Sequence, residues 1–332
     1  MAGDFRQCLP VVPGANRAQS VNACIKESNL WKYFKVHSLT ENMRVRASGD
    51  PILENFDKWT LSLGDGKAND ENDKVIIPED LLVQIKANTK NDKNVEKDCM
   101  KQFCRKVFNN LENNLIDPNW LEGRAILAPT NTQVDTINDL IESWVPGAPT
   151  KLSSADTLEN YKDVMRFNTE YLNILRPNGF PRHIISLKRG MPLMLLRNIN
   201  PKEGLCNGTK LIFVRTISNK LLVCKLAGSD RQVLLPRIKF LPDTGDHPFE
   251  WARLQFPIRV AFATTINKSQ GQTLTHVGVW LQSPVFNHGQ LYVACSRVGK
   301  PTSLNIAIKQ EAEQQADQTD NIVFKEVLLP TI

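Results

Sequence analysis

Long apolar runs are what this sequence lacks most clearly. In its 332 residues, no stretch approaches the roughly 18 consecutive apolar residues of a membrane span. Charged residues such as Asp4, Arg6 and Glu27 interrupt the apolar pattern near the start of the chain. We therefore expect neither a membrane span nor a signal peptide, and hence a soluble chain of the intracellular type.

Closely spaced cysteines are missing too. The seven cysteines lie far apart in the chain and form no CxxC pair. An odd and scattered set is typical of buried, reduced thiols, whereas zinc sites and disulfide frameworks need paired or regularly spaced cysteines. We expect no metal site built on them.

Acidic residues are scarce in the second half of the chain. Overall, 41 Lys and Arg stand against 35 Asp and Glu, which gives a net charge of +6. Between residues 182 and 309 the count is 18 basic against 5 acidic residues, and residues 251–309 contain no Asp or Glu. The asymmetry favours a polyanionic partner such as nucleic acid, although a basic face is often only a solvated surface.

The length and the 41% apolar content are sufficient for one large domain or two modest ones. Residues 1–12 read as the end of a buried strand that runs into a loop. Ser20 predicts the start of a helix, and residues 36–39 predict a short strand. A strand, a helix and a strand within so few residues indicate the last part of a parallel α/β domain, with too little chain before residue 45 to complete its sheet.

A second α/β domain is expected behind a polar connector. Residues 46–122 are polar and predict helices near 51–62 and 95–113. Residues 125–128 then predict a buried strand, which is followed by an apolar helical stripe behind Thr132. A strand followed by a helix starts a new α/β unit.

A β insertion splits this second domain. Between residues 184 and 240 the apolar period shortens to that of strands, with turn signals at Asn207-Gly208, Ser218-Asn219 and Gly228-Ser229. A small antiparallel barrel would satisfy this pattern. After Pro257 the alternation returns, with strands expected at 260–263, 277–281 and 304–308 and helices at 265–274 and near 288–298.

Two later segments are difficult to explain by packing alone. Residues 264–274, TTINKSQGQTL, place hydroxyl, amide and ammonium groups directly after an apolar strand, where open α/β sheets bind ligands. Residues 288–298, HGQLYVACSRV, place Arg297 near the end of an apolar helix. An arginine in that position often binds the terminal carbonyl groups of the helix, so a structural role competes with a functional one.

Five motifs in a fixed order resemble those of superfamily one DNA helicases of the PIF type. The motifs are GDFRQ at 3–7, LTENMR at 39–44, APTN at 128–131, TINKSQGQTL at 265–274 and YVACSR at 292–297. Residues 187–211, LKRGMPLMLLRNINPKEGLCNGTKL, are still more similar to the helicase part of Helitron transposons. The resemblance extends from residue 2 to the TDNIVFKEVL segment at 319–328.

The resemblance implies an α/β fold of RecA-like, P-loop NTPase-type lobes. We expect a second RecA-like lobe with a small antiparallel β-barrel insertion, preceded by a fragment of the first lobe. The expected parts are the end of the first lobe at 1–45, a helical connector at 46–122, the second lobe at 123–180 and 241–310, the barrel insertion at 181–240 and a C-terminal tail at 311–332.

The resemblance also implies the site residues of an ATP-dependent 5′ to 3′ DNA helicase that acts on single-stranded DNA or DNA junctions. Gln7, Arg44 and Arg297 match catalytic positions that contact nucleotide, with Arg297 as the arginine finger, and Gly271 matches a nucleotide-binding position. A guanidinium suits the finger role because its planar fork neutralises charge on phosphoryl oxygens. The expected DNA-binding residues are Thr130, Asn131, Thr265, Lys268, Ser269 and Gln270.

Further residues have weaker assignments. His288 precedes the last motif helix and is expected to be a capping or packing residue. In the insertion, basic side chains are candidate phosphate contacts, although any one of them alone is more typical of a solvated surface; they are Lys188, Arg189, Arg197 and Lys210. We expect no membrane partner and no small-molecule substrate other than ATP.

A phosphate-binding loop is absent from the sequence. The two Gly-Lys pairs, Gly66-Lys67 and Gly299-Lys300, lack both the upstream glycine and the following Ser or Thr of GxxxxGK[ST]. ATP and Mg²⁺ belong to the complete family enzyme, and the Walker A and Walker B elements that hold them are not found here. We therefore expect the C-terminal portion of a helicase that is inactive alone.

Two alternatives stay open. One is a non-catalytic module that binds single-stranded DNA, and the other is a degenerate transposon remnant. A nuclear location follows from the family alone.

Overall fold

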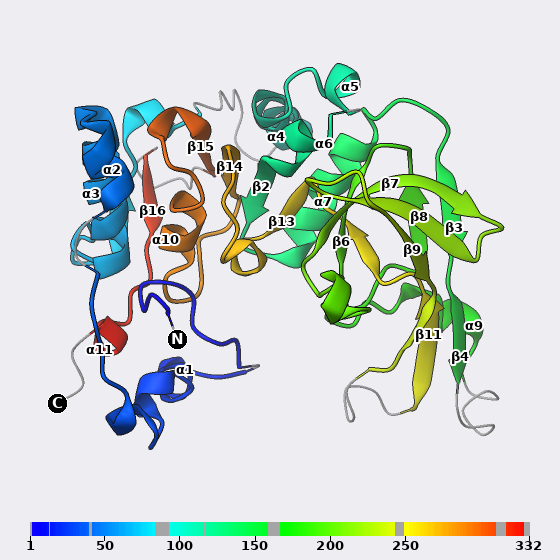
Figure 1. The fold of residues 1–332 in the computed structure, drawn as a ribbon, viewed down its shortest axis with the longest axis horizontal. Helices are drawn as coiled ribbons and strands as arrows, with labels where there is room; N and C mark the ends of the chain where they lie inside the picture. The colour runs from blue at the N-terminus through cyan, green and yellow to red at the C-terminus, as the bar shows by residue number, and fades with distance from the viewer. Residues whose placement is uncertain are drawn as a thin grey trace. The chain divides into compact units, whose positions relative to one another are not determined.

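The protein is described by a computed structural model (Figure 1). The described residues are 2–12, 14–39, 42–83, 93–115, 117–158, 167–242, 249–309 and 317–328. The chain divides into two compact units, a first unit of residues 1–109, 123–137 and 263–332 and a second unit of residues 110–122 and 138–262. No helix in the described ranges combines the length and the apolar character that crossing a bilayer requires.

A parallel sheet of four strands forms the centre of the first unit, in the order β13-β2-β14-β15. Its strands are β2 (Arg124–Ala128), β13 (Ala263–Thr265), β14 (His276–Leu281) and β15 (Leu304–Ile308). All neighbouring pairs run parallel. Strands at 125–128, 277–281 and 304–308 were predicted and are confirmed, whereas the strand expected at 260–263 is divided between β13 and β12 (Ile258–Val260).

One face of this sheet packs against α3 (Pro51–Asp65) and α10 (Gln290–Cys295). Because successive side chains of a strand point to opposite faces, Val277 and Val279 share this face. They belong to one buried cluster with Leu63 of α3 and Leu291 of α10. The apolar side chains on this face of β14 therefore form the surface against which both helices pack.

The opposite face packs against α4 (Lys93–Val107). A Cβ atom built on Gly278 would lie 2.6 Å from Cγ2 of Val107 and 2.9 Å from Cζ of Phe103. The Phe103 ring also lies 5.2 Å, centroid to centroid, from the ring of Trp280. Gly278 thus allows the close approach of the helix.

The helices expected in the connector form these two layers. α3 begins after Asp50, whose side chain accepts a hydrogen bond from the Ile52 N–H, and ends at Gly66 in the left-handed conformation. The predicted helix at 51–62 is confirmed and extends by three residues. The helix predicted at 95–113 ends at Val107 and is followed by the short α5 (Leu111–Asn114).

The first 50 residues differ most from expectation. No strand forms among described residues 2–12 or at 36–39, since an extended segment becomes a strand only beside a pairing partner. The first helix, α1 (Arg17–Asn22), begins after Asn16 rather than at Ser20, because Asn16 and Gln19 form a reciprocal capping box. It is followed by the short helices η1 (Ile25–Glu27), η2 (Trp31–Tyr33) and α2 (Met43–Ser48).

The C-terminal segment crosses the first unit and is held by it. β16 (Gln318–Asp320) pairs antiparallel with β1 (Lys74–Ile76), and α11 (Lys325–Leu328) follows. Leu9, Cys24, Phe324 and Val327 form a small buried cluster. Residues near both ends of the chain therefore share one apolar core. The remaining short helices of this unit are η3 (Glu79–Leu81), η5 (Ile266–Ser269) and η6 (Pro301–Ser303).

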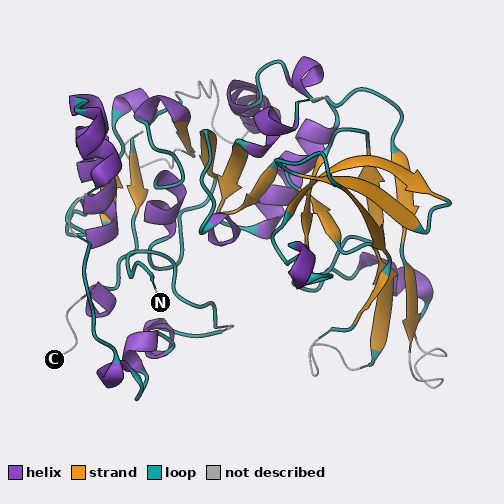
Figure 2. Cartoon of the chain, in the orientation of Figure 1, coloured by secondary structure: helices purple, strands orange, loops and turns teal. Residues whose placement is uncertain are grey.

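The second unit consists mainly of strands, whereas helices and strands alternate in the first (Figure 2). Its largest sheet has the order β12-β6-β7-β8-β9 and is antiparallel throughout. The strands are β6 (Pro192–Leu195), β7 (Lys210–Ile217), β8 (Leu221–Leu226) and β9 (Gln232–Pro236) together with β12. β7 and β8 are joined at Ser218-Asn219, both with positive φ, as the turn signal predicted.

Two smaller sheets complete this unit. β3 (Thr150–Ser153) pairs with β5 (Ile184–Leu187) and contributes to the same apolar core as the large sheet. β4 (Ala155–Leu158), β10 (Ile238–Phe240) and β11 (Trp251–Gln255) form the third sheet, beside α9 (Thr169–Ile174). Strands β3 and β12 lie outside residues 181–240, so the sheets of the insertion draw on flanking chain. The unit also contains α6 (Pro118–Glu122) and η4 (Pro201–Glu203).

Candidate functional site

The carboxyl ends of β13 and β2 lie side by side in the first unit. Thr265 at the end of β13 is the register partner of Ala128 at the end of β2. Thr130 follows Ala128 by two residues, and α7 (Asn131–Glu142) begins at the next residue, Asn131. The structure therefore brings three of the predicted DNA-binding residues to one edge of the sheet, as expected for ligand sites in open α/β folds.

Thr130 shapes this edge as well as lining it. Its Oγ1 accepts a hydrogen bond from the Gln133 N–H at 3.4 Å, as a helix N-cap does. The Gln133 side chain donates in turn to Oγ of Ser283 at 2.9 Å, in the loop that follows β14. The start of α7 thus connects the ends of two strands, β2 and β14.

The loop after β13 divides the remaining predicted residues into two groups. Ser269 is fully buried and its hydroxyl donates to the Ile266 carbonyl at 2.7 Å, so this hydroxyl serves the loop itself. Lys268 and Gln270 are exposed. Gly271 has φ +80°, which favours glycine at this position. The helix predicted over 265–274 shortens to the single turn η5.

Arg297 binds this loop from the end of α10. Its Nη1 donates to the Gln272 carbonyl at 3.0 Å and, at 3.5 Å, to that of Ser269. Its Nε donates to the Val293 carbonyl at 2.9 Å, and Nη2 donates to Oγ of Ser296. Four donor contacts engage most of the five guanidinium N–H groups, and burial lowers the pKa of Arg297. The helix-capping role considered for Arg297 is present in the structure.

A second link between α10 and the loop was not foreseen from the sequence. Gln290, fully buried, donates from Nε2 to Oδ1 of Asn267 at 2.8 Å. Its Oε1 accepts from the Phe286 N–H at 2.9 Å. The loop is therefore anchored at both ends of α10, by Gln290 and by Arg297. The sequence signal for this role is a polar glutamine at the start of an otherwise apolar helix.

The segment that carries Gln7 is held against α10 and α3. Tyr292 donates from its hydroxyl to Oδ2 of Asp4 at 2.7 Å, and Nε of Arg6 donates to Oδ1 of Asp65 at 2.6 Å. Burial, followed by the Asp4 contact, raises the pKa of Tyr292. Among the described residues, the Gln7 side-chain amide has no hydrogen-bond partner. These contacts of Asp4 and Arg6 hold the segment on which Gln7 lies.

Arg44 lies in α2. Its side chain is outside the described part of the structure, so its expected nucleotide contact stays a prediction.

The basic candidates of the insertion are mostly committed to internal contacts. Lys188 donates from Nζ to the carbonyls of Glu142 and Val145, at 3.0 and 2.7 Å. Lys210 is half-buried and donates from Nζ to the Glu122 carbonyl at 3.1 Å, and burial lowers its pKa to about 8. The Arg197 guanidinium lies 5.1 Å from the Phe240 ring centroid. Arg189, by contrast, is exposed.

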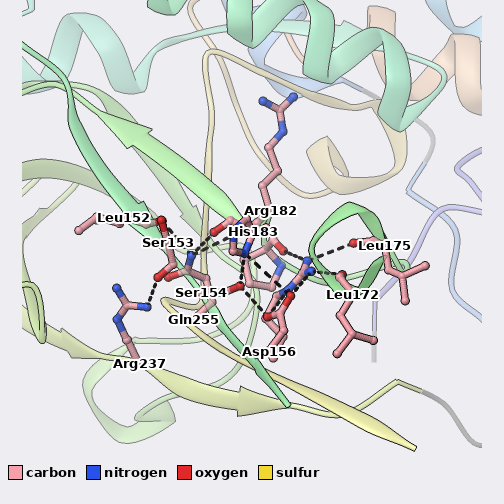
Figure 3. Close-up of polar contacts among 12 residues, drawn as sticks. Leu152, Ser153, Ser154, Asp156, Leu172, Leu175, Arg182, His183, Arg237 and Gln255 are labelled. Atoms are coloured by element: carbon pink, nitrogen blue, oxygen red, sulfur yellow. Dashed lines mark hydrogen bonds and ion pairs between the residues drawn. The ribbon is translucent and has the colours of Figure 1, made fainter. Parts of the chain in front are cut away.

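A buried ion pair in the second unit also went unpredicted. Arg253 and Asp156 have no exposed side-chain area, and Nη2 lies 2.7 Å from Oδ2. The guanidinium donates further to the carbonyls of Leu172, Leu175 and Pro181. Figure 3 shows the carbonyls of Leu172 and Leu175 converging near Asp156. This arginine joins β11 to β4 and α9, although it lies in the basic 182–309 region whose charge favoured a polyanionic partner.

The residues present do not make a nucleotide site by themselves. No GxxxxGK[ST] sequence occurs in the chain, and the described residues contain no group of three or more His, Cys, Asp or Glu side chains that could hold a metal ion. Gln7 and Arg297 are single groups that can touch a phosphate but cannot enclose one.

Two family models match the sequence. Residues 1–74 match the model described as PIF1-like helicase, and residues 170–215 match the model described as DNA helicase Pif1, 2B domain. Among curated proteins, the chain is 32% identical to ATP-dependent DNA helicase Pif1 of Bdellovibrio bacteriovorus over 141 residues, which cover 39% of this chain and 31% of that protein. It is 35% identical over 125 residues to ATP-dependent DNA helicase PIF1 of Xenopus laevis, covering 37% of this chain and 19% of that protein. The chain thus spans a third or less of the length of these relatives.

Solved structures extend the likeness to nearly the whole chain. The crystal structure of Pif1 helicase from Candida albicans covers 98% of this chain and 65% of its own, with a TM-score of 0.59 and 22% identity. Pif1 helicase from Bacteroides in complex with ADP-AlF3 and ssDNA covers 99% of this chain and 63% of its own, with a TM-score of 0.56 and 17% identity. At these identities the comparison establishes the fold, an α/β fold with RecA-like character.

Proposed function

We propose that this chain is a portion of an ATP-dependent 5′ to 3′ DNA helicase of the PIF1-like family, whose models match residues 1–74 and 170–215. In this proposal the edge formed by the ends of β2 and β13 binds the backbone of single-stranded DNA, at a free strand or at a junction. Hydroxyl and amide groups suit that task because they bond phosphates without reading base identity.

One observation supports the proposal most strongly. Arg297, the expected arginine finger, donates to the Gln272 and Ser269 carbonyls of the loop that carries Lys268 and Gln270. In this proposal, the residue assigned to the nucleotide and the loop assigned to the DNA are therefore in direct contact. Coupling between two ligands requires a physical connection of this kind.

We propose that different residues of this site contact the DNA and the nucleotide. Lys268, Gln270 and Thr265 lie on the loop, and Thr130 and Asn131 lie at the start of α7; all five are proposed to contact the DNA backbone. Ser269 shapes the loop from inside. Gln7, Arg44, Gly271 and Arg297 are proposed to face the nucleotide.

The finer assignments belong to the same proposal. We place residues 1–45 with the first RecA-like lobe, 123–180 and 241–310 with the second, and a barrel-type insertion at 181–240. A Helitron-like origin, a nuclear location and a task in DNA repair or recombination follow from the resemblance.

We further propose that these 332 residues do not hydrolyse ATP when isolated, because their sequence contains no phosphate-binding loop. The same observation favours a second candidate function, a single-stranded DNA-binding module without turnover. The two candidates share the proposed DNA-binding edge, and neither predicts ATP hydrolysis by the isolated 332 residues. They differ in whether the chain takes part in ATP hydrolysis as a portion of a complete helicase. DNA-stimulated hydrolysis by the isolated chain that Arg297→Ala abolishes would contradict both the missing loop and the second candidate.

DNA binding is tested with the complete chain and a labelled single-stranded oligonucleotide, by fluorescence anisotropy at about 50 and about 200 mM salt. We expect binding at the lower salt, and we expect Lys268→Ala to weaken it and to reduce the salt slope by about 0.7, the value for one lost phosphate contact on a single strand. The matched control is Lys101→Ala, at an exposed position on α4, which should change neither. Absence of binding at about 50 mM salt would refute the DNA-binding proposal.

A further inference from the structure

His288 lies where the Gln7 segment, the C-terminal segment and the start of α10 meet. Its Nδ1 accepts a hydrogen bond from the Phe324 N–H at 2.9 Å. Its Nε2 lies 2.8 Å from the Phe5 carbonyl oxygen. A backbone N–H can only donate, and a carbonyl oxygen can only accept. The ring is therefore neutral, with its proton on Nε2.

The C-terminal segment is bound at several points along its length. Asn321 is fully buried and donates from Nδ2 to the Leu63 carbonyl at 2.9 Å. The Ile322 carbonyl accepts from the Gly289 N–H at 3.0 Å. Phe324 stacks on the His288 ring with a centroid distance of 5.4 Å. Residues 317–328 thus lie as a strap on the first unit.

Gly289 brings the Gln7 segment equally close from the other side. A Cβ atom on Gly289 would collide with the carbonyl oxygen of Arg6 and lie 2.8 Å from the carbonyl carbon of Gln7. Its φ of +70° also favours glycine. The dipeptide His288-Gly289 therefore holds the backbone on which Gln7 lies, while His288 holds the strap.

We propose that His288 is a positioning residue through which the C-terminal strap sets the position of Gln7. The inference rests on the proposed function only in treating Gln7 as a ligand-sensing group. The mechanical claim is separate: when the strap is bound, His288 keeps the Phe5–Gln7 backbone against α10, and when the strap is loosened, that backbone loosens with it.

Charged groups surround this junction. Arg17 on α1 lies 4.9 Å from the Phe324 ring centroid and forms an ion pair with Glu326 at 2.8 Å. Asp4 approaches from the Gln7 segment, and Lys26 donates from Nζ to the Val327 carbonyl at 2.7 Å. These contacts flank the two His288 hydrogen bonds but do not replace them, because they reach other atoms of the strap and of the segment.

Two substitutions can separate the two bonds of His288. In His288→Asn the side-chain oxygen can take the place of Nδ1 and keep the bond to Phe324, while the donor to Phe5 is lost. In His288→Gln the terminal amide can keep the donor to Phe5, while the acceptor for Phe324 is lost. Hydrogen exchange of the complete chain reports both sides. We expect about tenfold faster exchange of residues 5–8 in His288→Asn and of residues 321–328 in His288→Gln.

Coupling is tested with Asn321→Ala, which loosens the strap at a distance from Gln7. We expect this substitution to speed exchange at residues 5–8 when His288 is present and to have no added effect there in the His288→Ala background. An Asn321→Ala effect confined to residues 317–328 would overturn the proposal. His276→Ala, at a histidine outside the junction, is the control.

The same variants keep this proposal distinct from the DNA-binding proposal. Exchange of the β14 amides checks that each variant is folded. Single-stranded DNA binding by the wild-type chain tests the proposed function, and the exchange pattern tests the strap. Either result can fail while the other holds.

Discussion

Nη1 of Arg297 and the carbonyl oxygen of Gln272 form a hydrogen bond of 3.0 Å that joins the end of α10 to the loop after β13. Because the bond is structural, Arg297→Ala should weaken DNA binding even without nucleotide. We expect it to lower the free energy of unfolding by about 2 kcal/mol. Urea denaturation and anisotropy measure the two effects. The control is Lys300→Ala, which removes an exposed cation nearby in the sequence. An Arg297→Ala chain with wild-type stability would show that the four donor contacts contribute nothing to the free energy of unfolding.

The Arg253 and Asp156 pair makes a strong prediction for the second unit. Asp156→Ala leaves a fully buried guanidinium without its carboxylate, and removing one partner of such a pair costs about 3 to 5 kcal/mol. We expect loss of cooperative unfolding or a large fall in the urea midpoint. The double variant Asp156→Leu with Arg253→Met should recover much of that loss, because it removes both charges. In the exposed pair of Lys225 and Asp230, Asp230→Ala should leave the midpoint unchanged.

The absence of a side chain at Gly278 allows α4 to pack closely against β14. The Cβ atom of Gly278→Ala would overlap Val107 and Phe103, and overpacking of this kind costs about 1 to 3 kcal/mol. A Cβ atom built on Gly299 meets no described atom within 4 Å, so Gly299→Ala should be tolerated. Thermal unfolding of the two variants, compared side by side, is the measurement. Equal melting temperatures would mean that the helix shifts without cost.

Lys210 should titrate near neutral pH. Burial lowers its pKa to about 8, below the roughly 10.4 of a lysine in an unfolded chain. Between these values the unfolded chain binds more protons, so this residue makes stability rise with pH through that interval. NMR of ¹³C-labelled lysines should show one resonance titrating near 8 that disappears in Lys210→Arg. A spectrum without such a resonance would contradict the buried environment.

The neutral His288 ring predicts an acid-sensitive strap. Burial, the largest effect, lowers the pKa of His288, with Arg17 in the same direction and Phe5, Asp4 and Glu326 opposing. The unfolded histidine titrates near 6.5, so the stabilisation is complete above that pH and decreases as pH falls below it. We expect hydrogen exchange at residues 321–328 to accelerate as the pH falls below about 6.5, and to do so less in His288→Gln. An unchanged acid response in His288→Gln would assign the effect to other groups.

The sequence predicted β2, β14 and β15 best because these strands are short, mostly apolar and bounded by polar loops. β2, β14 and β15 needed no knowledge of distant partners. The helix expected from Ser20 failed for the opposite reason. Val21 and Cys24 pack with Phe324 from the far end of the chain, and this tertiary contact overrides local periodicity.

At the candidate site, residue type was predictable and hydrogen-bond direction was not. Thr265 and Thr130 meet at the sheet edge as the position after a strand implied. Counting charges could not reveal that Lys188, Lys210 and Arg253 direct their donors inward, because burial depends on neighbours that a linear pattern does not specify. Gln290 was missed because a polar residue beside an apolar stripe usually faces solvent.

The pairing of β13 with β2 has a consequence for the order of folding. Most of the second unit lies between these two strands in the chain, although they are direct neighbours in the sheet. During synthesis, β2 must remain without this neighbour until the intervening residues have emerged. Strands β6, β7, β8 and β9 pair with one another in sequence order, so these pairings can form meanwhile. Because the parallel sheet has the higher contact order, we expect it to form late, and we expect the edge formed by the ends of β2 and β13 to be completed only after the insertion has folded.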